Sequence, residues 1–317
     1  MKAILYDQFG PSSVVAWRNT ARPTPGPGQV LLKVQAAALN PKDVLVRKGR
    51  MKLLSGSRFP RTPGHDVAGV VVEKHPSVTD FDLGDALYGM ISPWTAGSCA
   101  QFVAVDTTDL APQPPEFDPA HAAAIPLVSL TALQALRDQL QVGPNTHVCL
   151  NGASGGVGTV AVQIARALGA RVTAVCSGRN AEHVTQLGAH QVIDYTQTDL
   201  RATTERFDAF FDIYGNHPYP KVKHLLKPKG RFATAIPRLS SVRRELMARA
   251  GLGRAHLVIV RSHRPDLDQI SGWLLQGALR PIIDRQMPMD ACAQAMTYLE
   301  TRRARGKIIL LPPEGAP

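Results

Sequence analysis

The chain has 317 residues, 44 % of them apolar, with 26 glycines and 25 prolines. This length and composition exclude a low-complexity or disordered chain and predict about two globular domains. Basic residues outnumber acidic ones by 36 to 25, a formal net charge of +11. A positive surface favours an anionic ligand, but the same charge also keeps a protein in solution, so charge alone does not decide the partner.

The cysteines and the start of the chain exclude further classes. Four cysteines without a C-x-x-C pair argue against a structural zinc site and a disulfide framework, and we expect buried, reduced thiols. Strand-like residues 2–6 stand where a signal or transit peptide would lie, and the longest apolar stretch, 119–136, is interrupted by polar residues. We therefore expect a cytoplasmic protein with no membrane span.

Short β-rich runs fill the first 118 residues. Three of them are 30–34, 67–72 and 100–105, each of strand length and separated from the next by glycine and proline. Such runs with turn residues between them are typical of a compact antiparallel barrel. The first domain is therefore predicted to be mostly β.

From about residue 120 onward, strands alternate with helices, which predicts a doubly wound parallel sheet. The predicted strands are 147–150, 171–175, 191–194, 207–213 and 230–236, and the helices are 157–168 and 181–187. Two later helices, 267–276 and 289–301, lead to a final strand, 307–311, that could rejoin the first domain. The predicted domains are thus residues 1–120 with 265–317, and residues 121–264.

A glycine-rich stretch, residues 151–158, lies between the strand at 147–150 and the helix that follows it. Glycines there let the chain turn tightly and bring its backbone against a pyrophosphate, while the helix N-terminus supplies free N–H groups. In this β-α-β context a dinucleotide site is favoured over a mere structural turn. The residues expected to bind the cofactor here are Ser154, Gly155, Gly156 and Val157.

The end of the next strand bears on the choice between the two nicotinamide dinucleotides. An NAD site would place an acid about 20 residues on, to bind the ribose 2′-OH. Residues 176–180 instead contain Ser177, Arg179 and Asn180, and no carboxylate. All three side chains can donate to a 2′-phosphate, which favours NADPH over NADH. In the alternative interpretation, Arg179 only solvates a surface loop.

Segments along most of the chain resemble one known family. They are residues 40–43, 63–69, 151–158, 187–195 and 304–307. On these motifs the chain resembles the zinc-free quinone oxidoreductase branch of the medium-chain dehydrogenase/reductase superfamily. Within that branch, residues 92–94, Gly97 and residues 176–177 are most similar to the reticulon-interacting mitochondrial oxidoreductases. The resemblance implies an α/β protein with a GroES-like β-barrel catalytic domain, a Rossmann domain, NADPH as hydride donor, and a homodimer.

The chain departs from the zinc enzymes of that superfamily at their metal ligands. Asn40 and Leu127 stand where those enzymes carry cysteines, and only His65 remains. Because a catalytic zinc needs three protein ligands, we expect no metal and interpret His65 as a packed, hydrogen-bonded residue. The tyrosine that enoyl reductases carry after the Asn-Pro motif is also absent from residues 49–52, which weakens an enoyl-thioester interpretation.

The resemblance also implies roles for residues at matching positions. Asn40 would lie beside the nicotinamide as the one catalytic residue, and Thr131 near its carboxamide. Ser177 and Tyr195 would reach the 2′-phosphate, and Ile213 would lie against a ribose. The loop Arg303-Ala304-Arg305 would close over the cofactor. Trp94 is assigned either to the wall of an acceptor cleft between the domains or to the barrel core.

These features predict a zinc-independent enzyme that transfers a hydride from NADPH to a quinone or a similar activated carbonyl. One alternative is an NADPH-dependent enone or alkenal double-bond reductase, for which solvent would have to supply the proton. A second, of another class, is an NADPH-sensing or RNA-binding protein, suggested by the charge and by the arginines at 243–244 and 302–305. Nucleic acid is disfavoured because no aromatic-basic stacking motif accompanies these arginines.

Overall fold

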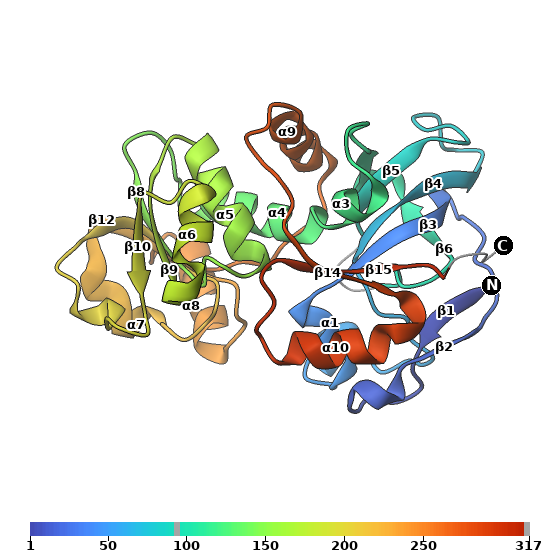
Figure 1. Ribbon diagram of the computed structural model, residues 1–317, viewed down its shortest axis with the longest axis horizontal. Helices are drawn as coiled ribbons and strands as arrows, with labels where there is room; N and C mark the ends of the chain where they lie inside the picture. The colour runs from blue at the N-terminus through green and yellow to red at the C-terminus, as the bar shows by residue number, and fades with distance from the viewer. Residues whose placement is uncertain (92–95, 314–317) are drawn as a thin grey trace. The chain divides into compact units, whose positions relative to one another are not determined.

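The computed structural model describes residues 1–91 and 96–313, so Trp94 lies outside the described residues. The chain divides into two compact units. Unit 1 comprises residues 1–127, 261–275 and 281–317, and unit 2 comprises residues 128–260 and 276–280. The first boundary thus falls inside a helix at residue 127 rather than at residue 120. Figure 1 shows the elements of both units along the chain.

Unit 1 is built on a seven-stranded sheet in the order β14-β15-β3-β4-β5-β7, with β6 also paired to β3. These strands are β3 (Gln29–Leu39), β4 (Asp66–Lys74), β5 (Ala86–Met90), β6 (Phe102–Asp106), β7 (Leu110–Pro112), β14 (Ile283–Pro288) and β15 (Lys307–Leu311). A separate antiparallel pair joins β1 (Lys2–Leu5) and β2 (Ala16–Asn19). All pairs in the larger sheet are antiparallel except β14 with β15. The final strand pairs with β3, so the C-terminal segment does return to the first part of the chain.

The core of unit 1 lies between this sheet and the C-terminal helix. Alternate residues of β3, such as Val30, Leu32 and Val34, are buried in one cluster with Cys292 and Met296 of α10. The helices of unit 1 are α1 (Pro41–Arg47), α2 (Lys52–Ser55), α3 (Pro119–Ala123), α9 (Arg264–Leu275) and α10 (Cys292–Glu300). Burial at spacings of three and four residues in α10 is the pattern of a helix with one apolar face.

Unit 2 contains a six-stranded parallel sheet in the order β10-β9-β8-β11-β12-β13. The strands are β8 (His147–Asn151), β9 (Arg171–Cys176), β10 (Gln191–Asp194), β11 (Phe207–Asp212), β12 (Leu226–Thr234) and β13 (Ala255–Leu257). Counted from β8, this order is 3-2-1-4-5-6, which is the arrangement of dinucleotide-binding sheets. The predicted parallel sheet is confirmed, although β12 begins four residues earlier than expected.

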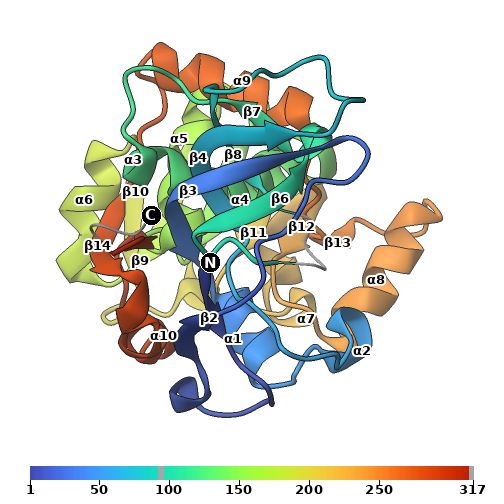
Figure 2. The same cartoon turned by 90° about the vertical axis from the view of Figure 1, so that its right-hand side faces the viewer.

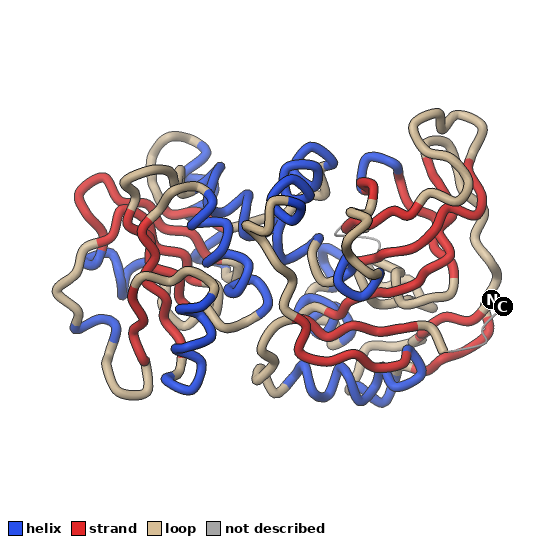
Figure 3. The backbone as a smooth tube through the Cα atoms, turned by 45° about the horizontal axis from the view of Figure 1, so that its top comes forward, coloured by secondary structure: helices blue, strands red, loops and turns tan. Residues whose placement is uncertain are grey.

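The helices of unit 2 are α5 (Gly156–Ala167), α6 (Ala181–Gln186), α7 (Tyr219–Val222) and α8 (Leu239–Arg249), and α4 (Pro126–Leu133) crosses from unit 1 into it. Helices α5 and α6 pack on the strands β8 to β10. Near α7, Val222 and Leu225 join a core with Phe210 and Phe232 of the sheet. Figure 3 shows that strands and helices alternate along unit 2, as the β-α-β pattern predicts. Over the described ranges, no helix is long and apolar enough to cross a membrane.

Candidate functional site

The glycine-rich loop joins β8 to α5 with a geometry that requires glycine at two positions. Gly152 has φ +90°, in the left-handed region that glycine adopts without strain. A Cβ on Gly158 would lie 2.1 Å from the Gly152 carbonyl oxygen, so a side chain there would push the loop open. The N-cap Gly155 supplies no side-chain acceptor to the first turn of α5. The N–H groups of that turn are therefore available to an anion.

Three of the predicted cofactor residues are brought together beside this loop. Asn180, at 5 % exposure, donates from Nδ2 to Ser154 Oγ at 3.0 Å and to Ser177 Oγ at 3.2 Å. Its Oδ1 atom is buried and, among the described residues, has no hydrogen-bond partner. A buried amide oxygen without a donor is costly, and a bound hydroxyl or amine would satisfy it. The Asn180 side chain thus links the end of β9 to the glycine-rich loop by hydrogen bonds.

Arg179 lies in the same turn and is exposed. Within the described part of the chain its guanidinium has no hydrogen-bond or ion-pair partner. Next to it, the Asp194 carboxylate accepts from the Gly178 backbone N–H, and from Thr196 at 2.7 and 2.9 Å through its hydroxyl and its backbone N–H. The Thr196 hydrogen bonds hold the pKa of Asp194 below its usual value. Sequence analysis missed this acid because it ends β10, the neighbouring strand, rather than β9.

The other residues predicted in unit 2 differ in how closely they approach the loop. Ile213 follows β11, and its backbone N–H donates to the Asn151 carbonyl at 3.1 Å, which places it at the start of the glycine-rich loop. Tyr195 follows β10 with its side chain 58 % exposed. Thr131 is buried within α4. Most of the predicted set thus lies at the carboxyl ends of parallel strands, where open α/β sheets bind ligands.

The residues of unit 2 therefore fit a dinucleotide. The loop and the N-terminus of α5 would hold the pyrophosphate. Ser177, Arg179 and Asn180 would face the adenosine ribose and its 2′ substituent. This assignment rests on the uncapped N-terminus of α5 and on the unpartnered Asn180 oxygen.

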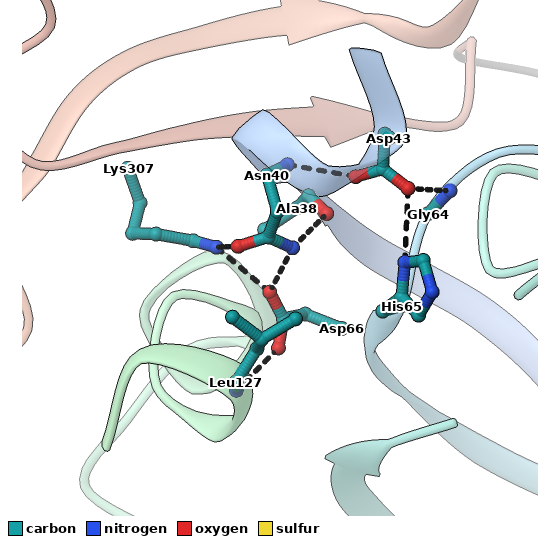
Figure 4. Close-up of polar contacts among 8 residues, drawn as sticks. All are labelled: Ala38, Asn40, Asp43, Gly64, His65, Asp66, Leu127 and Lys307. Atoms are coloured by element: carbon teal, nitrogen blue, oxygen red, sulfur yellow. Dashed lines mark hydrogen bonds and ion pairs between the residues drawn. The ribbon is translucent and has the colours of Figure 1, made fainter. Parts of the chain in front are cut away.

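A second polar cluster lies in unit 1, where β3, β4 and β15 meet (Figure 4). Lys307 Nζ lies 2.7 Å from Asp66 Oδ2 and 2.5 Å from Asn40 Oδ1. The Asn40 Nδ2 atom donates to the same Asp66 oxygen at 2.9 Å, and the Leu127 backbone N–H donates to the other at 2.6 Å. All three side chains are nine-tenths or more buried. The cluster is a buried ion pair bridged by an amide.

The turn that carries Asn40 is fixed by a neighbouring carboxylate (Figure 4). Asn40 is the N-cap of α1, Pro41 follows it, and the Asp43 side chain accepts from the Asn40 backbone N–H at 2.7 Å. Asp43 Oδ1 also lies 2.9 Å from His65 Nδ1 and 2.9 Å from the Gly64 N. Burial raises the pKa of Asp43, but His65 and the two N–H donors outweigh burial and hold it below its usual value. The prediction that His65 is packed and hydrogen-bonded is confirmed.

Comparison with known proteins matches both units. Residues 26–115 match the family of alcohol dehydrogenase GroES-like domains, and residues 187–310 match the zinc-binding dehydrogenase family. The chain is 33 % identical to the chloroplastic NADPH-dependent alkenal/one oxidoreductase of Arabidopsis thaliana, over 98 % of this chain and 80 % of that protein. The chain belongs to the medium-chain dehydrogenase/reductase superfamily. More narrowly, its relatives place it in the quinone oxidoreductase branch that the motifs predicted.

Two further relatives support that placement. The mitochondrial NAD(P)H oxidoreductase RTN4IP1 of Mus musculus is 32 % identical, over 98 % of this chain and 89 % of the relative. The quinone oxidoreductase structure from Coxiella burnetii superposes with a TM-score of 0.91 at 30 % identity, over 99 % of each chain. This reductase is thus an α/β oxidoreductase that uses a nicotinamide cofactor. It consists of a GroES-like part and a Rossmann-like part. The predicted fold class and enzyme class are confirmed.

His65 is held by a carboxylate of unit 1, because its Nδ1 atom lies 2.9 Å from Asp43 Oδ1. Asn40 and Leu127, which the resemblance aligns with two zinc ligands of related enzymes, carry no thiol. Over residues 1–91 and 96–313, no group of three or more histidine, cysteine, aspartate or glutamate side chains is placed to hold a metal ion. The four cysteines are unpaired and buried, as predicted.

The remaining predicted residues of the reductase lie in unit 1. The Asn40 amide is only 1 % exposed and is held by Lys307 and Asp66, so its role toward the nicotinamide stays a prediction. Arg303 and Arg305 are exposed, and Ala304 packs on the core of unit 1. Their closure over the cofactor likewise stays a prediction. Sequence analysis gave no role to Lys307 or Asp66, although a lysine that opens the apolar strand 307–311 was a signal.

Proposed function

We propose that this reductase transfers a hydride from NADPH, in preference to NADH, to a quinone or similar activated carbonyl without zinc. The observation that carries the proposal is the arrangement at the end of β9. There Asn180 joins Ser177 to Ser154 of the glycine-rich loop, and the exposed Arg179 lies in the same turn as Asn180. These groups are donors suited to a 2′-phosphate. When bound, the cofactor supplies the hydride, and the chain holds, orients and shields the reactants.

Asp194 works against this preference. Its carboxylate lies beside Gly178, where a Cβ would be 2.4 Å from Asp194 Oδ2. A negative charge there repels a 2′-phosphate but accepts from a 2′-OH. Cofactor choice is therefore the difference between attraction by Arg179 and repulsion by Asp194. One charge-assisted hydrogen bond is worth about 1.5–3 kcal/mol, or roughly ten- to a hundredfold in affinity.

The test is a titration of both cofactors by fluorescence. Arg179→Ala should weaken NADPH binding about tenfold or more and leave NADH binding nearly unchanged, because only the 2′-phosphate needs the guanidinium. Asp194→Asn should tighten NADPH binding. Arg171→Ala is the matched control, an exposed arginine at the opposite end of β9. Equal affinity of the wild-type protein for the two cofactors, or an equal loss in both arginine variants, would refute the preference.

The acceptor is proposed from chemistry rather than from a pocket. Asn40 and Leu127 at the former ligand positions leave no set of three donors to polarise a carbonyl through zinc, so an easily reduced acceptor suits the site. Because one relative is by name an alkenal/one oxidoreductase, enones are the second candidate. A panel of quinones and enones with product identification separates the two. We also propose a homodimer and a cytoplasmic location, which light scattering and cell fractionation test.

A further inference from the structure

Helix α8 of unit 2 has its polar and apolar faces reversed. The residues it turns inward are polar: Ser241 is 7 % and Glu245 is 6 % exposed. Leu239, Val242 and Leu246, spaced three and four residues apart along one outward stripe, are 89 %, 42 % and 65 % exposed. A helix on a protein surface normally turns its apolar stripe to the core. The outward apolar stripe of α8 is therefore exposed, whereas such a stripe normally packs against other apolar residues.

Hydrogen bonds keep the polar face of α8 turned inward. Ser241 accepts from the Arg238 N–H at 2.7 Å and donates to the Arg238 carbonyl at 2.8 Å. Glu245 accepts from the Leu257 N–H of β13 at 3.1 Å and from Arg249 at 2.7 Å. The bond from the Leu257 N–H fixes the rotation of α8 on the edge of the sheet, beyond β12 and β13 (Figure 2), whereas the Ser241 bonds close the N-terminus of the helix itself. The apolar stripe is held outward by the fold.

The charges around the stripe have one sign. Residues 238–254 contain arginines at 238, 243, 244, 249 and 254, and a single acid, Glu245, which is buried. Arg243 lies between Leu239 and Met247 on the helical projection and is exposed. Arg249 lies next to Val242 on the other side and pairs with Glu245 at 2.7 Å. Leu252, 73 % exposed, extends the apolar surface past the end of the helix. Within residues 238–254 the apolar stripe is thus accompanied by arginines and by no exposed acid.

We propose that α8 is an interfacial helix that docks this protein on an anionic phospholipid surface. Leucines that enter the headgroup boundary and arginines that contact lipid phosphates are the two components of such binding. A second copy of the chain is disfavoured as the occupant, because a two-fold contact would bring the same arginine-bordered face against itself. A nucleic acid would use the arginines but leave the leucines exposed. Docking through α8 would not depend on which compound accepts the hydride.

The test is co-sedimentation of the full chain with vesicles of phosphatidylcholine alone or with about 30 % phosphatidylglycerol. We expect binding to the anionic vesicles that falls as salt is raised, and weak binding to neutral ones. Leu239→Ser with Leu246→Ser should lower the partition coefficient at least about tenfold, because both side chains would enter the boundary. Arg243→Gln with Arg254→Gln should lower it by about fivefold per arginine. Leu83→Ser, at a leucine of unit 1 that is 64 % exposed, is the matched control and should change nothing.

Other outcomes overturn the proposal. Equal binding to both vesicles, no binding, or unchanged binding of the leucine variant would each refute it. Light scattering and a mobility shift with single-stranded RNA are run on the same variants. A dimer that the leucine variant dissociates, without vesicle binding, would assign α8 to a second copy. RNA binding lost only in the arginine variant, without vesicle binding, would assign it to nucleic acid. Because the replaced side chains are exposed, melting curves of all variants should match the wild type.

Discussion

Replacing Lys307 with methionine tests the polar cluster of unit 1. The substitution keeps the length of the side chain and removes its charge. Asp66 would remain fully buried with two of its donors, the Leu127 N–H at 2.6 Å and Asn40 Nδ2 at 2.9 Å. The Asn40 carbonyl oxygen would lose the ammonium now 2.5 Å away. Removing one partner of a buried ion pair costs about 3–5 kcal/mol, and because two donors remain we expect about 3 kcal/mol.

Urea unfolding followed by tryptophan fluorescence measures this loss in unit 1 itself. Trp17 packs against the core of that unit and Trp273 lies in its helix α9, whereas residues 128–260 and 276–280 of unit 2 contain no tryptophan. With a slope of roughly 2 kcal/mol per molar, a loss of about 3 kcal/mol lowers the urea midpoint by roughly 1.5 M. The matched control is Lys33→Met, at an exposed lysine of β3, which should stay within about 0.5 kcal/mol of wild type.

A double variant separates the ion pair from simple loss of packing. Asp66→Asn combined with Lys307→Met leaves no unpaired buried charge, so the double variant should be more stable than Lys307→Met alone. A Lys307→Met midpoint equal to that of the Lys33→Met control would refute the reasoning. Strictly additive losses in the double variant would do so as well, because they would show that the two side chains are not coupled.

Three further predictions concern other parts of the structure. Gly158→Ala should weaken cofactor binding at least about tenfold and lower the free energy of unfolding by about 1–3 kcal/mol. Gly155→Ala should fold normally, because its Cβ would lie 3.6 Å from the nearest atom. Equal melting temperatures of the two variants would contradict this prediction. Asn40→Asp should unfold at lower urea than Asn40→Ala, because its carboxylate would lie within about 2.9 Å of Asp66, and the reverse order would contradict the contact. Burial lowers the pKa of Lys42 from 10.5 to about 8. Between pH 8 and 10.5 the unfolded chain therefore binds more protons than the folded protein, so the wild type should gain stability relative to Lys42→Met as the pH rises through this range. Plots of unfolding free energy against pH that run parallel for the two proteins would contradict this prediction.

The sequence predicted those features that local pattern determines. Residues 151–158 could be placed between a strand and a helix because glycine spacing and the change from strand to helix period are local signals. The parallel sheet followed from the alternation of strands and helices. The cofactor roles of Ser177 and Asn180 stay predictions, and the structure adds the hydrogen bonds from Asn180 to Ser154 of the loop and to Ser177.

The features that sequence missed depend on contacts between distant segments. Asn40, Asp66 and Lys307 lie at the ends of three strands, and nothing in the sequence around any one of them shows that the three side chains meet. Asp194 approaches Gly178 only because β10 lies beside β9 in the sheet. Helix α8 was not predicted, although Leu239, Val242 and Leu246 follow helical spacing. That its apolar stripe faces outward depends on a contact between distant segments, the hydrogen bond from the Leu257 N–H of β13 to Glu245.

The central claim is NADPH-dependent, zinc-independent hydride transfer to a quinone. The most direct measurement is kcat/KM for NADPH and NADH with one quinone, on protein whose zinc content has been determined by elemental analysis and which has been treated with a chelator. The account predicts at least about tenfold preference for NADPH, with one quinol formed per NADPH oxidised and no dependence on zinc. Equal kcat/KM for the two cofactors, or activity lost with the chelator and restored only by zinc, would contradict it.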